Sequence, residues 1–129
     1  MRFDIVLPIL GFEDMKEAEL ERIDDIFAKL KGNDGKKEVS FTLIDPFVLR
    51  KYEIEIPKYY KKLLDIEEKD NILTLCSMIV EKPIENSKVN FIAPFVFNID
   101  KKKMLQVVLD ERKYKDYGIM ENISDYIRG

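Results

Sequence analysis

The chain of 129 residues contains no histidine and a single cysteine. Histidine is the side chain whose ordinary pKa lies closest to neutral pH, so its absence excludes a Ser-His-Asp triad, a Cys-His pair and any histidine-bound metal. Cys76 alone cannot form an intrachain disulfide or a zinc site built from several thiolates. Because it lies in the apolar run 72–80, we expect a buried structural thiol in a reducing cytoplasm.

Glycine and long apolar runs are also scarce. The five glycines are not spaced as a phosphate-binding loop or a dinucleotide fingerprint, so a nucleotide-using enzyme is not expected. The longest apolar runs, such as 91–97, are much shorter than the roughly 20 residues that span a bilayer. The first residues show no basic and apolar signal segment. We therefore expect a soluble cytoplasmic protein without a membrane partner.

The charge is high but nearly balanced. The sequence has 22 basic and 25 acidic residues, a net charge of −3 and a pI near 5.2, which does not support direct nucleic-acid binding. Hydrophobic residues make up 46%, enough for one ordered core, and the length predicts a single domain over 1–129. Acid pairs such as Asp24-Asp25 lack calcium-loop spacing, so we expect no metal and no cofactor.

Most apolar runs are typical of strands, because they alternate or are rich in β-branched and aromatic residues and stop at proline or turn residues. We predict strands at 3–7, 39–44, 52–56, 72–80, 89–98 and 104–109. The last two of these are expected to form a hairpin, and Pro94 within them predicts an edge or a bulge. A short helix is expected at Pro57–Leu64, where proline can begin the first turn, and another in the last dozen residues.

The segment 17–30 is ambiguous. Leu20, Ile23, Phe27 and Leu30 follow the spacing of an amphipathic helix. The alternative is a pair of strands, 17–23 and 26–31, joined through Asp24-Asp25 and followed by a turn at 32–35.

Several motifs then occur in a specific order along the chain. An Asp-Pro-Phe turn at 45–47 is followed by an Asn-x-x-Ala-Pro strand at 90–94 and a Gln-Val-Val-Leu strand at 106–109, and an early Leu-Gly-Phe turn stands at 10–12. Around them lie the stretches 41–47, 52–57 and 87–98. Over nearly its whole length the sequence resembles the FliW family of flagellar assembly factors.

The resemblance implies a mainly β, single-domain antiparallel β-barrel-like fold with one or two short helices, and no catalytic activity. It favours strands over a helix at 17–30. It also implies two protein partners in the bacterial cytoplasm. One is flagellin, which family members bind like a chaperone; the other is CsrA, an RNA-binding translational repressor whose capture relieves repression of flagellin mRNA. We expect the free protein to be monomeric.

An acidic run offers a surface for a basic partner such as CsrA. Between positions 13 and 25 there are seven acids against Lys16 and Arg22. Such a run is either a solvated strand face or a docking face whose charge steers a basic protein. The candidate CsrA contacts are Glu13, Asp14, Glu17 and Glu19, with Phe47 as an exposed anchor after its turn.

Flagellin requires an apolar surface, for which the hairpin 95–98 and 104–109 is the candidate. The residues assigned are Phe95, Phe97, Val107 and Leu109. The alternative is a plain core hairpin, since alternate residues of a half-buried strand must face the core. Two competing functions stay open: a flagellin chaperone without a CsrA role, and a small enzyme using carboxylates, which only the abundance of Asp and Glu supports.

Overall fold

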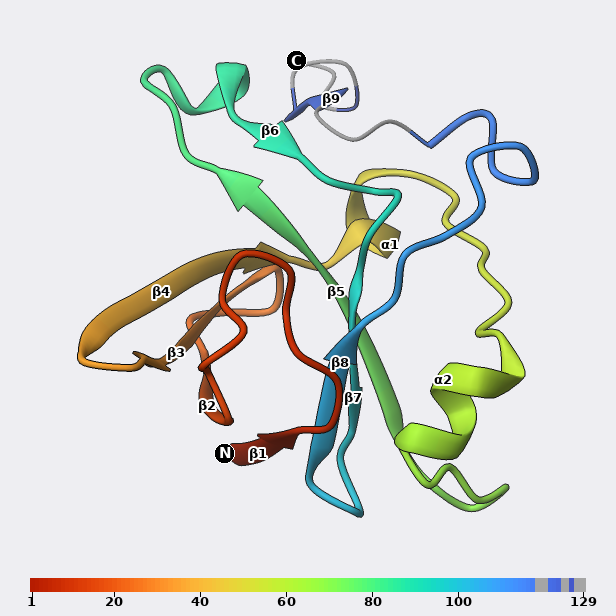
Figure 1. The fold of residues 1–129 in the computed structure, drawn as a ribbon. Coiled ribbons are helices and arrows are strands. Elements are labelled where there is room, and N and C mark those ends of the chain that lie inside the picture. The colour runs from red at the N-terminus through yellow and green to blue at the C-terminus, as the bar shows by residue number, and fades with distance from the viewer. Residues whose placement is uncertain (118–120, 124–125, 127–129) are drawn as a thin grey trace.

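The computed structural model describes residues 1–117, 121–123 and 126. Short strands dominate it, and its two α-helices are one to two turns long (Figure 1). No helix among these residues is long and apolar enough to cross a membrane. In chain order the elements are β1 (Arg2–Ile5), β2 (Glu17–Arg22), β3 (Phe27–Asp34), β4 (Lys37–Ile44), α1 (Pro46–Leu49), α2 (Lys58–Leu63), β5 (Ile72–Ile79), η1 (Ile84–Asn86), β6 (Lys88–Val89), β7 (Phe95–Asn98), β8 (Lys103–Gln106) and β9 (Glu121–Asn122).

Seven of the strands close into a barrel. The sheet runs in the order β4-β3-β2-β1-β8-β7-β5, and β4 also pairs with β5, which joins its two ends. The pairs are antiparallel except β1 with β8, which is parallel. β6 and β9 extend the sheet beyond β5 (Figure 1). The predicted mainly β, barrel-like fold is therefore confirmed, with one parallel contact that the sequence did not indicate.

The ambiguous segment 17–30 forms two strands, β2 and β3. Ala18 and Leu20 are buried while the acids on either side of each are exposed, so the alternation follows the two-residue period of a strand. Ile23, which completed the helical pattern, lies in the connection and is 54% exposed. The connection is held by Asp24, whose Oδ1 accepts hydrogen bonds from Ile26 N–H and Phe27 N–H at 2.8 and 2.7 Å.

The predicted strand 52–56 is wrong, because this segment pairs with no strand. The helix after it is confirmed as α2, which begins behind the N-cap Pro57. The predicted end of the 39–44 strand at Asp45-Pro46 is also confirmed, and a helix, α1, follows directly. Asp45 caps α1 by accepting a hydrogen bond from Phe47 N–H at 2.9 Å.

The predicted strand 89–98 is two strands, β6 and β7, separated by 90–94. Pro94 stands directly before β7 and not inside a ladder, which agrees with its missing N–H. The β7–β8 hairpin is confirmed, with β8 ending at Gln106. The helix expected in the last dozen residues is not observed at Glu121–Asn122, which forms β9; positions 118–120, 124–125 and 127–129 lie outside the described residues.

The strand β7 is buried on both faces, because the barrel interior lies on one side and α2 with its neighbouring loops covers the other. Phe95 and Phe97 belong to the interior cluster, where the Phe97 ring meets Phe3 edge-to-face at 5.0 Å. Val96 points the opposite way and packs with Leu64, which follows α2. This double burial determines which of the predicted site residues a partner can reach.

Candidate functional site

The acids predicted to contact CsrA lie on β2 and on the loop before it. Glu17 and Glu19 are exposed on the outer face of β2. Arg2 on β1 forms ion pairs with both: its Nη1 lies 3.0 Å from Glu17 Oε2 and its Nε lies 3.9 Å from Glu19 Oε2. Half of the predicted acidic surface is therefore engaged by a neighbouring strand.

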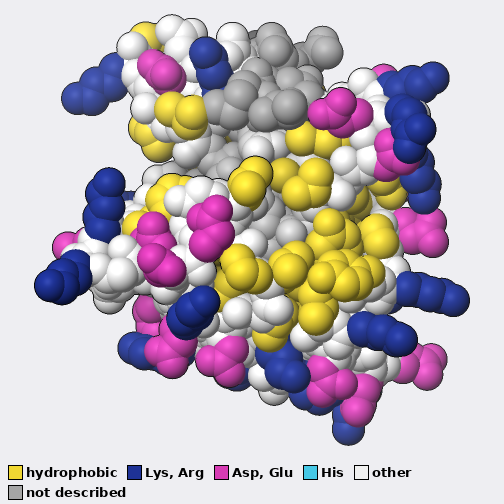
Figure 2. Space-filling model, viewed as in Figure 1, with side chains coloured by type: hydrophobic (Ala, Val, Ile, Leu, Met, Phe, Trp, Pro, Cys, Tyr) yellow, Lys and Arg dark blue, Asp and Glu magenta, His cyan; other side chains and the backbone are white. Residues whose placement is uncertain are grey.

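Lysines on β3 extend this pairing across the barrel wall. Lys31 lies opposite Glu19 and Lys29 opposite Glu21, and Lys31 Nζ is 3.4 Å from Glu21 Oε2. Figure 2 shows the same mixture, with acidic and basic side chains interspersed over the part of the molecule formed by β1–β4. The run that is acidic in sequence is thus a mixed-charge ladder in three dimensions.

The acids of the preceding loop are different. Glu13 and Asp14 are exposed, and their carboxylates form no ion pair with any residue that the structure describes. The β3–β4 hairpin brings further acids to them, because Asp14 N–H donates a hydrogen bond to Asp34 Oδ1 at 2.9 Å. Asp14 and Glu38 line one polar groove of about 390 Å³, whose wall also carries Arg2, Lys16 and Lys31 together with Glu17 and Glu19. We call Glu13, Asp14, Asp34 and Glu38 the acidic tip.

Sequence reasoning missed Asp34 and Glu38. Asp34 ends β3 and pairs with Lys37 across the turn 35–36, where Gly35 has a positive φ of 67°, and Glu38 pairs with Asn33 one position further along. The sequence predicted a turn at 32–35, but β3 continues to Asp34 and the turn lies at 35–36; a turn placed there would have set these acids beside the loop.

Phe47 lies on α1, away from these acids. Its side chain is 56% exposed, and its ring contacts Tyr52 edge-to-face at 5.7 Å. In Figure 1, α1 is well separated from β2. The structure confirms Phe47 as an exposed aromatic side chain but does not bring it together with Glu13, Asp14, Glu17 and Glu19.

The four residues assigned to flagellin are core residues, which corrects the prediction. Phe95 and Phe97 are 1% and 0% exposed inside the barrel, and Val107 and Leu109 are 0% and 3% exposed beneath α2 and its loops. The alternative of a core hairpin holds for these side chains, since both faces of the hairpin are covered. An apolar contact with a partner must use other residues.

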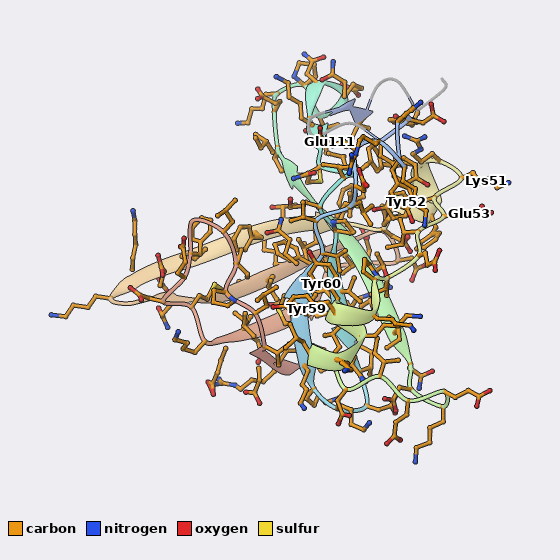
Figure 3. All side chains as sticks on the ribbon, turned by 45° about the vertical axis from the view of Figure 1, so that its right-hand side comes forward. Lys51, Tyr52, Glu53, Tyr59, Tyr60 and Glu111 are labelled. Carbon is orange, nitrogen blue, oxygen red and sulfur yellow. The ribbon has the colours of Figure 1, made fainter. Side chains whose placement is uncertain are left out.

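A buried aromatic cluster lies beside α1. Tyr52 donates a hydrogen bond to the Phe91 carbonyl at 2.6 Å and stacks on Tyr117, while the Arg50 guanidinium lies 4.7 Å from the Tyr117 ring centre. Burial raises the pKa of Tyr52 well above its ordinary value. Next to Tyr52 in the chain, Lys51 and Glu53 lie at the outer edge of the molecule (Figure 3). The cluster is a packed core with a satisfied hydroxyl.

Nothing in the described part of the chain groups three or more acids or thiols in a way that could hold a metal ion. Cys76 is fully buried, as predicted, and burial raises its pKa to about 12. Among the described residues, two of the surfaces that a partner could recognise by charge or apolar contact are the acidic tip and the exposed aromatic residues on helices.

Comparison with known proteins identifies relatives of this chain in sequence and in fold. The model of the FliW protein family matches residues 2–121. A flagellar assembly factor FliW of Sulfurimonas denitrificans is 48% identical over 99% of both chains, and one of Campylobacter lari is 42% identical over 99% of this chain and 98% of its own. A crystal structure of the flagellar assembly factor FliW superposes with a TM-score of 0.82 at 24% identity, covering 95% of this chain and 84% of the other.

The structural likeness agrees with the closed barrel described above, and the sequence likeness extends over nearly the whole chain. The chain therefore belongs to the FliW family of flagellar assembly factors.

Proposed function

We propose that this protein is a non-enzymatic, cytoplasmic binding protein that captures CsrA, antagonises its repression of flagellin mRNA, and binds flagellin as a chaperone-like partner. The observation that carries the proposal is the match to flagellar assembly factors over 99% of the chain. Membership in a family of flagellar assembly factors agrees with a role in supplying flagellin for the filament. The two partners are those that the family resemblance implies.

The acidic tip is the proposed contact for CsrA. An RNA-binding repressor must display positive charge, and unneutralised acids steer such a protein and repel phosphate near its RNA groove. Glu13 and Asp14 meet this requirement better than Glu17 and Glu19, which already pair with Arg2. Asp34, held beside Asp14, adds a further acid, with Lys37 as its cross-strand partner.

The two partners are linked by reciprocity. If flagellin weakens the complex with CsrA, CsrA must weaken flagellin binding by the same factor. Accumulated flagellin then releases CsrA, and repression of flagellin mRNA resumes.

The test reverses charge at the acidic tip in the variant Glu13→Lys/Asp14→Lys. Neither carboxylate has an ion-pair partner among the described residues, and Glu13 Oε1 accepts one exposed hydrogen bond, from Gly11 N–H at 3.2 Å, so the variant should fold with little loss of stability. CsrA affinity at low salt is expected to fall by about ten- to a hundredfold, chiefly through slower association, and flagellin binding should be retained. A filter or gel assay then follows release of flagellin mRNA from CsrA.

The matched control is Glu81→Lys/Glu85→Lys, which changes the net charge equally at two exposed acids near β6. This control should bind CsrA like the wild type. Equal CsrA affinity for the tip variant and the control would show that the acidic tip is only a solvated surface. Flagellin binding by a wild type that does not capture CsrA at any salt concentration would favour the chaperone-only alternative. A separate Phe47→Ser variant tests whether Phe47, the candidate aromatic anchor on α1, contributes to CsrA binding.

A further inference from the structure

An exposed apolar surface lies between α2 and the chain that leaves β8. Tyr59 is 61% exposed and Val108 is 59% exposed, while Leu7, Tyr60 and Leu63 are half-buried against the core beneath. Figure 2 shows apolar side chains gathered in this region, between β8 and α2. We call these five residues the α2 surface.

The α2 surface is built on fixed backbone. Val107 N–H and Leu109 N–H donate hydrogen bonds to the carbonyls of Pro94 and Ile92, both at 2.9 Å, so their side chains point inward and Val108 points outward. The Tyr60 hydroxyl accepts a hydrogen bond from Val108 N–H at 3.4 Å. On α2 the Tyr59 and Tyr60 rings meet edge-to-face at 5.5 Å, and Figure 3 shows the two residues side by side.

Lysines border this surface. Lys58, Lys61 and Lys62 are exposed and line a hollow of about 320 Å³ together with Asp65 and Ile66. The three ammonium groups make no ion pair with any residue in the described part of the chain. The side of α2 that carries these lysines is therefore mainly positive, with Asp65 as the acid in the hollow, in a protein whose net charge is −3.

We propose that the α2 surface binds an amphipathic helical segment of a partner protein that carries acidic side chains beside its apolar stripe. An apolar stripe at helical spacing fits against exposed aromatic and aliphatic side chains, and acids flanking it would meet the three lysines. Val108 and Leu7 offer aliphatic contact, which suits a protein segment better than nucleic-acid bases. The inference rests on the proposed function and deepens it, because it assigns the apolar contact with a second partner, which the buried hairpin residues cannot make, to a surface outside the barrel.

The first experiment uses two synthetic helical peptides with the same leucine stripe, one flanked by glutamate and one by lysine, titrated into the 15N-labelled full chain. The glutamate-flanked peptide should shift the amide signals of α2 and of 107–109, and the lysine-flanked peptide should bind at least about tenfold more weakly. The proposal is wrong if neither peptide shifts any amide signal, or if the shifted signals belong to other parts of the chain. It is also wrong if the two peptides bind equally well. If a short single-stranded RNA shifts these amide signals and the peptides do not, the proposal that the partner is a protein is wrong.

The second experiment compares charge reversals of equal size. Lys61→Glu/Lys62→Glu should weaken the glutamate-flanked peptide about tenfold and strengthen the lysine-flanked one, whereas Lys36→Glu/Lys37→Glu at the β3–β4 turn should change neither. Tyr59→Ser should weaken both peptides, since it removes apolar contact without touching the core. The proposal is wrong if the two charge variants behave alike. It is also wrong if Tyr59→Ser, with an unchanged spectrum of the core, binds like the wild type.

Discussion

The hydroxyl of Tyr117 is bonded to both backbone groups of Glu53. It accepts a hydrogen bond from Glu53 N–H at 2.7 Å and donates one to the Glu53 carbonyl at 2.9 Å. The neighbouring Tyr114 hydroxyl accepts from Glu55 N–H at 2.8 Å, and the two tyrosine rings stack at 5.5 Å. Side-chain hydroxyls thus take the place of a neighbouring strand and keep the segment 52–56 extended outside the sheet.

The variant Tyr117→Phe should be less stable by about 1–2 kcal/mol, because it removes both hydrogen bonds of Glu53 while keeping the stacked ring. Tyr114→Phe, which removes one bond to Glu55, should lose about half as much. Urea unfolding followed by circular dichroism measures the difference. Equal stability of both variants and the wild type would mean that water replaces the hydroxyls without loss.

Gly32 on β3 should not tolerate alanine. A Cβ at this position would collide with Met15 Cε and would lie 2.7 Å from the Glu17 carbonyl oxygen on the paired strand. Backbone on one side and a buried methionine on the other leave little room to relax, so Gly32→Ala should cost about 1–3 kcal/mol. Thermal unfolding of Gly32→Ala is compared with that of Ser40→Ala, an exposed change on β4 that should be nearly neutral.

Asp70 should make stability depend on pH in the acid range. Glu67 N–H, the Asn98 amide and Lys101 Nζ hold its Oδ2 at 2.9, 3.0 and 3.1 Å and lower its pKa to about 2. This pKa is below the value of an aspartate in the unfolded chain, which is near 4. The stability that ionised Asp70 contributes is therefore fully present above about pH 4 and is lost as the pH falls toward 2.

The measurement is the urea midpoint of the wild type and of Asp70→Asn at pH 6 and at pH 2.5. The wild type should be the more stable at pH 6, and the difference should shrink at pH 2.5. Glu85→Gln, a change at an exposed acid, serves as the control. A difference that stays constant between the two pH values would contradict the assignment.

The Cys76 thiol should be unreactive in the folded protein. It is 0% exposed, and burial raises its pKa to about 12, so very little thiolate exists near neutral pH. A thiol reagent such as Ellman's reagent at pH 8 should label the chain only after denaturation. Rapid labelling of the native protein would show that β5 opens readily around this residue.

The mixed-charge ladder predicts that the two halves of the acidic run respond differently when the charge of their acids is reversed. Glu17→Lys/Glu19→Lys would place two more cations beside Arg2 and should lower the melting temperature, especially at low salt. Glu13→Lys/Asp14→Lys should leave it nearly unchanged, since these carboxylates have no ion pair among the residues described. Differential scanning calorimetry at low and high salt distinguishes the two, and similar melting temperatures would argue against the ladder.

Local patterns in the sequence were enough for most strands and for α2. Alternation and β-branched composition indicated β4 and β5, and Pro57 marked the beginning of the helix. These features depend on steric and hydrogen-bonding preferences within a few residues, which the chain carries with it. The segment 52–56 shows the limit of such patterns: its alternation is that of a strand, but its backbone partners are tyrosines about sixty positions away.

The sequence by itself determined that this is a highly charged, histidine-free β protein with one buried thiol, and its motifs indicated the family. Only the tertiary structure decided which surface residues are available. Pairing of β2 with β1 and β3 set Arg2 and Lys31 on either side of Glu19 and brought Arg2 to Glu17, and closure of the barrel beneath α2 buried Phe95 and Val107. Charge neutralisation across strands and burial of both faces of a strand depend on neighbours distant in sequence, so no local pattern could reveal them.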